Sequence, residues 1–207
     1  MKNNPLFILV AAATVGGLLT TFAGAAHASD GTVITRTGTY TTSTGGSGTM
    51  SSVTDRSQGV VSRQGSWTNV SGAKGTWQTQ ATWNPSTHTA AISGSATNPK
   101  GVTRSWTATA ERTAPGTFSE KGTFTTTDGK TGSFTATRLK TSAGAWEKQE
   151  VITTADGKTI NRDVLTSVAN GSGTRTVTTN LPDGRTLTRS DSFTQTVSTA
   201  PQAAPTP

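Results

Sequence analysis

Residues 127–138 read Thr-Asp-Gly-Lys-Thr-Gly-Ser-Phe-Thr-Ala-Thr-Arg, and this stretch decides the fold. Its Asp-Gly pair at 128–129 recurs at 156–157 and 183–184, at intervals of 28 and 27 residues. Asp-Gly between alternating runs is the strongest short-range signal for a β-hairpin, because the favoured two-residue turns need positive φ at both central positions. The repeat therefore predicts a chain of stacked β-hairpins.

Weaker turn signals extend the repeat towards the N-terminus and also occur between its copies. Degenerate copies of the Asp-Gly turn lie at 45–48, 71–74 and 98–101. A second set of turns lies between them, at 58–59, 84–86, 114–116, 143–144 and 170–173. The combined spacing leaves room for about twelve strands of about ten residues, and it leaves none for crossover helices.

Alternation within the strands indicates one sparsely apolar face. Trp77, Ala81 and Trp83 share one side of a strand, with Gln78 and Gln80 on the other. We therefore predict an all-β antiparallel meander that curves into a sheet or barrel over this face, since closure also removes free edges. An extended single-layer or solenoid-like sheet is the alternative.

The chain ends differ in composition from the repeat region. Residues 1–28 resemble a signal peptide, with Lys2, an apolar stretch at 6–22 and a small-x-small site at 26–28. A retained N-terminal anchor is the alternative reading of that segment. We expect a repeat domain at 29–197, a disordered Pro/Ala tail at 198–207 and no transmembrane segment after residue 28. These features predict an exported protein of the periplasm or extracellular space.

The composition of the chain argues against a thick apolar core. Threonine accounts for 43 of the 179 residues after position 28, and the chain has no cysteine. Disorder competes with an ordered sheet on these grounds. Threonine is a good strand former, however, and the turns recur in register, so we expect an ordered sheet.

Catalytic signatures are missing from the sequence. His88 is the one histidine after the expected cleavage point, which excludes histidine-dependent triads and His/Cys zinc sites within one chain. Glu111 with Glu120, and Glu147 with Glu150, are candidate carboxylate pairs, but cross-strand pairing of the first two with Arg112 and Lys121 is the simpler reading. The repeated Asp residues are better explained as turn formers than as calcium ligands. We therefore expect no enzyme activity, no cofactor and no metal.

Positive charge and tryptophan are the two features that suggest a function. After residue 28 the chain has 17 basic and 11 acidic residues, a net charge of +6. Cations attract anionic partners, and aromatic faces stack on sugars or bases. These features predict a binding module for anionic polymers, namely acidic polysaccharide, lipopolysaccharide or DNA. The candidate ligand-binding residues are Trp77, Trp83, Trp106, Arg104, Arg112, Arg138 and Lys140.

Other readings of the same features remain open. The tryptophans can instead form most of the core, and the charges can be a solvated surface. Self-assembly of Thr-rich strands into a structural or adhesin-like matrix is the alternative function. An outer-membrane barrel fits the strand count, but the sequence disfavours it because both faces carry Thr, Ser, Gln and Arg.

The recurring Asp-Gly-(Lys/Arg)-Thr turn with a following Thr-Arg-Ser run resembles small exported proteobacterial proteins built from Gly/Thr-rich hairpin repeats. The resemblance covers residues 98–197 well and residues 30–97 poorly. It implies an exported hairpin-repeat fold, and it implies no activity and no site residues.

Overall fold

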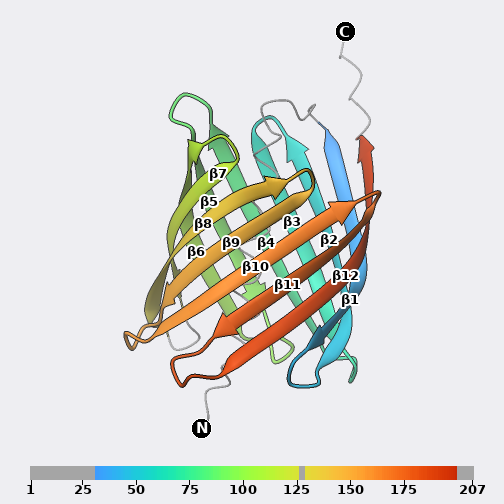
Figure 1. Cartoon of the computed structure of the whole chain (residues 1–207), viewed down its shortest axis with the longest axis vertical. Helices are drawn as coiled ribbons and strands as arrows, with labels where there is room; N and C mark the ends of the chain where they lie inside the picture. Colours follow the sequence, from blue (N-terminus) through green and yellow to red (C-terminus); the bar gives the residue numbers. More distant parts are fainter. Residues whose placement is uncertain (1–30, 126–128, 200–207) are drawn as a thin grey trace.

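The structure is a computed structural model that describes residues 31–125 and 129–199 (Figure 1). These residues form strands joined by turns. The strands are β1 (Thr32–Thr42), β2 (Ser47–Ser57), β3 (Val60–Asn69), β4 (Lys74–Asn84), β5 (Thr89–Thr97), β6 (Thr103–Ala114), β7 (Thr117–Thr125), β8 (Thr131–Ser142), β9 (Ala145–Thr153), β10 (Thr159–Ala169), β11 (Ser172–Asn180) and β12 (Thr186–Thr199).

The strands form a closed antiparallel meander. Each strand pairs with its neighbours in sequence, and β1 pairs with β12 from Thr32↔Thr199 to Thr42↔Arg189. The strands run obliquely to the long axis, as closure of a sheet requires (Figure 1). The all-β meander is therefore confirmed, and it closes into a twelve-strand barrel rather than an extended single layer.

The two sets of turns found in the sequence lie at opposite ends of the barrel. The turns at 58–59, 85–88, 115–116, 143–144 and 170–171 lie at one end, called here the tight-turn end. The Asp-Gly turns and their degenerate copies lie at the other, the Asp-Gly end, where β5 meets β6 and β9 meets β10. The alternation of two turn types along the chain is thus a direct consequence of its up-and-down topology.

Turn geometry differs from the expectation at the Asp-Gly end. Gly157 has a φ of 79°, but Asp156 keeps a negative φ, and the Thr154 N–H bonds the Lys158 carbonyl across a three-residue loop. This is a hairpin loop with glycine in the left-handed position, not the predicted two-residue turn. Two-residue turns with both central φ values positive occur at the tight-turn end instead, as at Asn170-Gly171 with 49° and 76°.

Glycine and aromatic residues face each other across neighbouring strands inside the barrel. Trp67 lies opposite Gly75, Trp77 opposite Gly65, and Trp106 opposite Gly94. A Cβ added to Gly65 would lie 2.6 Å from Cζ2 of Trp77. The glycine on one strand thus provides the space for the ring on the next. This pairing lets a chain with few aliphatic residues fill a wide barrel.

Two apolar clusters occupy part of the interior. One fills the Asp-Gly end and contains Trp106, Phe134 and Ile152. The other lines the wall formed by β3–β7 nearer the tight-turn end and contains Ile92 and Phe118. The remaining interior, towards β1, β2 and β8–β12, is polar, and the charged side chains gather there.

Several sequence-based expectations fall on residues that the structure does not describe. The expected signal peptide, Asp128 of the first Asp-Gly turn and most of the Pro/Ala tail belong to this group. β12 ends at Thr199, two residues beyond the expected domain boundary at 197. No helix in the described part of the chain is long and apolar enough to cross a membrane.

Candidate functional site

The interior of the barrel holds most of the charge that the strands carry. Residues two apart on a strand share a face, so alternation assigns each side chain to the inside or the outside. Twelve charged side chains face inward and are buried or half-buried. The nine cations are Arg36, Arg56, Arg63, Arg104, Arg138, Lys148, Arg162, Arg175 and Arg189, and the three carboxylates are Glu120, Glu150 and Asp191.

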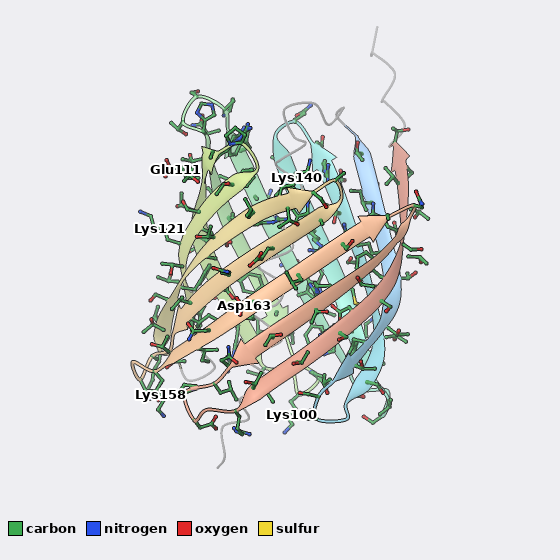
Figure 2. All side chains as sticks on the ribbon, in the orientation of Figure 1. Lys100, Glu111, Lys121, Lys140, Lys158 and Asp163 are labelled. Carbon is green, nitrogen blue, oxygen red and sulfur yellow. The ribbon has the colours of Figure 1, made fainter. Side chains whose placement is uncertain are left out.

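The outer surface of the strands is nearly free of charge by comparison. Its six charged side chains are Asp55, Lys74, Glu111, Lys121, Glu147 and Asp163. Two further cations, Arg112 and Lys140, are exposed at the tight-turn end. Glu111 and Lys121 lie along the outer edge of the barrel in Figure 2, whereas Lys100 and Lys158 lie in turns of the Asp-Gly end.

Hydroxyl groups dominate the outer surface and bond one another across strands. Most outward positions carry threonine or serine. The hydroxyls of Thr97 and Thr103 lie 2.8 Å apart, and those of Ser51 and Ser66 lie 3.1 Å apart. Large apolar side chains are also exposed there, among them Leu139, Val151 and Leu165 on β8, β9 and β10. Most of this face is therefore uncharged, and part of its polarity is satisfied within the sheet.

A first buried ionic network joins β7, β9 and β10. The Nζ of Lys148 lies 3.1 Å from a carboxylate oxygen of Glu120 and 3.1 Å from one of Glu150. Glu150 also pairs with Arg162. All four side chains are almost completely buried. Two carboxylates and two cations thus balance each other in this part of the interior.

A second network lies on β11 and β12. Asp191 accepts a hydrogen bond of 2.7 Å from Nε of Arg175 and one of 2.6 Å from Nε of Arg189. The Arg189 guanidinium also stacks over the ring of Tyr40, 4.3 Å from its centroid. One carboxylate therefore serves two cations, and this network carries a net positive charge.

Three further guanidiniums of the interior pair with aromatic or neutral groups. Arg138 lies 4.1 Å from the ring centroid of Trp146, and Arg63 lies 4.7 Å from that of Trp77. Arg36 donates a 2.8 Å hydrogen bond from Nε to Gln195. Cation–π contacts stabilise a guanidinium only in part, by about 2 kcal/mol in a desolvated site.

A small cavity lies between these guanidiniums. Arg36, Arg63, Arg138 and Arg175 line it together with Lys148, and Met50, Trp146, Val164 and Phe193 form its apolar wall. Glu147 and Thr166 complete the lining. The centre of a water-sized molecule can occupy about 30 Å³ of it. The cavity is thus a chamber of a few water molecules.

The structure brings only some of the predicted ligand-binding residues together. Trp106 and Arg138 are buried, with exposed fractions of 4% and 2%. Trp77, Trp83 and Arg104 also point inward and are half-buried. Arg112 and Lys140 lie apart from them, exposed at the tight-turn end. The alternative reading of the tryptophans as core residues describes their positions well.

Sequence reasoning missed the acidic and most of the basic members of the interior. Glu120 and Glu150 were considered only as candidate catalytic partners of Glu111 and Glu147. Register separates both pairs, because Glu111 and Glu147 face outward whereas Glu120 and Glu150 face inward. The suggested cross-strand pairing with Arg112 and Lys121 is wrong for Glu120, since Glu120 pairs with Lys148.

Aspartate in the Asp-Gly turns has a local structural role. Asp156 accepts a 2.5 Å hydrogen bond from the Thr154 hydroxyl and pairs with Lys158 at 2.9 Å. Asp183 accepts a bond from the Arg185 backbone N–H at 3.1 Å. No cluster of three or more potential metal ligands occurs among the residues that the structure describes.

Comparison with known proteins identifies the fold and no family. No protein-family model matches the chain, and no curated protein matches it. Among solved structures, the chain is similar to a KdgM porin, with a TM-score of 0.57 and 8% sequence identity. The match covers 79% of this chain and 97% of the porin. The chain thus has the fold of a twelve-strand porin, and the resemblance to exported hairpin-repeat proteins stays a prediction.

These findings correct the predicted function. Binding of anionic polymers required an exposed basic and aromatic surface, but the barrel encloses those side chains in an interior too small for a polymer. Self-assembly through strand edges is also wrong, because closure leaves no edge unpaired. A secreted or periplasmic protein is contradicted by the porin-like barrel, with most of its strand charges inside and fewer on the outer wall.

Proposed function

We propose that this chain is a non-enzymatic β-barrel of the bacterial outer membrane with a filled, positively charged lumen. The observation that carries the proposal is the inverted distribution of charge: twelve charged strand residues face the interior, and six face outward. A water-soluble protein has the opposite arrangement, because its charged side chains lie on its surface. A membrane barrel has a polar interior and an uncharged outer band.

The geometry of the barrel supports the same assignment. Its strands are 9–14 residues long, and a strand needs about 9–11 residues to span a bilayer. Closure leaves no strand edge unpaired, so ladder hydrogen bonds are made within the sheet, as the bilayer interior demands. The even number of antiparallel strands is typical of bacterial outer-membrane barrels.

The threonine-rich wall is the unusual part of this proposal. A hydroxyl placed in hydrocarbon is costly unless it is hydrogen-bonded. Cross-strand pairs such as Thr107 with Thr123 and Thr37 with Thr194, at 3.5 Å and 3.3 Å, reduce that cost. Val53, Val151 and Leu165 add apolar area between them. We therefore propose a wall adapted by hydroxyl pairing rather than by continuous aliphatic side chains.

The packed lumen determines what the barrel can pass. Its apolar cluster fills the Asp-Gly end, and the remaining cavity holds only a few water-sized molecules. The proposed protein therefore excludes sugars and larger solutes in this conformation. The similar solved structure is named as a porin, and this chain would be a porin-like barrel with a closed lumen.

Localisation of the full chain tests the proposal. The protein is expressed in a bacterium with an outer membrane, the membranes are separated by density, and each fraction is examined by gel electrophoresis with and without boiling. We expect the protein in the outer-membrane fraction, resistant to carbonate extraction, with a mobility that changes on boiling. Recovery in the soluble periplasmic fraction would overturn the proposal.

A further inference from the structure

Arg138 and Arg63 bring positive charge to the cavity, and neither forms an ion pair within the described part of the chain, although the charge of Glu120 acts on Arg138 from a longer distance. Both are buried, with exposed fractions of 2% and 5%. Both terminal nitrogens of Arg138 and the Nε of Arg63 form no hydrogen bond within the described part of the chain. Arg36 uses its Nε on neutral Gln195, and it lines the same cavity. Three guanidiniums from β1, β3 and β8 thus meet at one chamber.

The nearby carboxylates pair with other cations, although the Oε1 of Glu120 accepts no hydrogen bond within the described part of the chain. Glu120 and Glu150 pair with Lys148, and Glu150 also pairs with Arg162. Asp191 pairs with Arg175 and Arg189. The inward-facing side chains comprise nine cations and three carboxylates, which leaves a net charge of +6.

An uncompensated buried charge is strongly unfavourable. Removal of one member of a buried ion pair is strongly destabilising, because the other charge stays without a partner. Guanidinium donors without an acceptor add a further desolvation cost. Because aromatic stacking offsets only part of this cost, the chamber needs mobile negative charge from solution.

The size and lining of the chamber restrict what can enter. A water molecule needs about 10–15 Å³ of the space measured for its centre, and the chamber offers about 30 Å³. One monatomic anion with one water molecule fits, whereas a polymer does not. Trp146, Met50 and Phe193 provide polarisable walls beside the cations, which suits a large, weakly hydrated anion.

We propose that this chamber binds a single halide-sized inorganic anion between Arg138 and Arg63. Arg36 and Arg175 complete the positive surroundings, and Lys148 stays held by its two glutamates. The site neutralises part of the lumen and thereby stabilises the closed barrel. It exists whether the barrel lies in a bilayer or in water, so it is independent of the proposed location.

Thermal unfolding of the folded full chain tests the site. The protein is exchanged into gluconate, which is too large for the chamber, and is titrated with chloride or bromide at constant ionic strength. We expect a saturable rise in the unfolding temperature with either halide. Equal unfolding temperatures in gluconate and in both halides would overturn the proposal.

Two substitutions assign the effect to the chamber. Arg138→Met removes the buried guanidinium, and Arg112→Met removes an exposed arginine from β6 as the matched control. A charge-assisted hydrogen bond is worth about 1.5–3 kcal/mol, so the halide dissociation constant should rise about 10- to 100-fold in Arg138→Met. The control should keep the wild-type constant. An unchanged constant in Arg138→Met would contradict the assignment.

Crystals of the unsubstituted protein provide a measurement that does not depend on a variant that folds. Crystals are soaked in bromide, and anomalous diffraction locates the ion. We expect an anomalous peak in the chamber, within hydrogen-bonding distance of Arg138. A chamber without such a peak, with bromide found only on the surface, would overturn the proposal even if halides raise the unfolding temperature.

Discussion

The indole ring of Trp67 on β3 lies over Gly75 on β4, its direct cross-strand partner. The nearest atoms to a Cβ added at Gly75 all belong to this ring, and its Cη2 would lie 2.6 Å away. The glycine is therefore required by the neighbouring aromatic residue rather than by a turn. Phe193 shows the same relationship with Gly173 on β11, where its Cζ would be the nearest atom to an added Cβ.

Gly75→Ala should destabilise the barrel by about 1–3 kcal/mol, because the new methyl group overlaps the Trp67 ring in a packed interior. Urea unfolding monitored by circular dichroism measures the change. The outward-facing substitution Thr76→Ala on the same strand serves as the control and should cost less than 1 kcal/mol, roughly. Combining Gly75→Ala with Trp67→Leu should cost less than the sum of the two single changes. Simple additivity would show that the ring and the glycine do not share one space.

Leu165→Arg should impair insertion into a bilayer, since Leu165 is 55% exposed on the outer face of β10. A charge on the lipid-facing side costs about 2–4 kcal/mol at the midplane and about 0–1 kcal/mol near the interface. Thr159→Arg, on the same face at the first residue of β10, is the matched control. Folding into phospholipid vesicles compares the two variants. Equal behaviour would mean that this face does not contact lipid.

Glu150→Gln should destabilise the barrel by about 3–5 kcal/mol, because it leaves Arg162 buried without its carboxylate and reduces the compensation of Lys148. Glu147→Gln, three residues earlier on β9 but facing outward, should change stability by less than about 0.5 kcal/mol. Chemical unfolding of both variants under one condition provides the comparison. Similar losses in the two would contradict a buried ionic network around Glu150.

Asp156 should titrate at unusually low pH. The hydrogen bond from the Thr154 hydroxyl and the bond and charge of Lys158 lower the pKa of its carboxyl group from 3.8 to about 2. The ionised carboxylate stabilises the turn. This stabilisation is therefore complete above about pH 4 and is lost as the pH falls through about 2. Nuclear magnetic resonance of the Asp156 carboxyl group measures the midpoint.

Thr154→Val removes the largest cause of this shift and should move the Asp156 midpoint back towards 3.8. Lys121→Met leaves the turn intact and should keep the low midpoint, because Lys121 lies on β7. A wild-type midpoint near 4 would show that the turn contacts do not persist in solution.

The sequence predicted the architecture because its turn residues carry strong local signals. The left-handed backbone at positions 157 and 184 favours glycine. Alternation on β4 correctly grouped Trp77, Ala81 and Trp83 on one face. The possibility of a closed barrel was predicted because closure removes the free edges of the sheet. The turn type was wrong because Asp156 accepts bonds from its own turn and keeps a negative φ.

The charged interior was the part that sequence reasoning did not predict. Residues two apart on a strand share a face, so Arg189 and Asp191 lie on the same side of the last strand as Leu187 and Phe193. Charged and apolar residues on one face signal a polar interior, but the cross-strand register that pairs Glu120 with Lys148 cannot be obtained from one strand alone. The same lack of register led to the suggested pair of Glu111 and Glu120, which are nine residues apart and face opposite sides.

Folding with and without lipid tests the central claim most directly. Unfolded chain in urea is diluted either into buffer or into buffer with phospholipid vesicles, and circular dichroism, vesicle flotation and protease resistance are measured. We expect protease-resistant β-structure that floats with the vesicles when lipid is present. In buffer alone we expect the chain to aggregate. If the chain instead folds in buffer to a monomeric barrel that does not bind the vesicles, the proposal of an outer-membrane barrel is wrong.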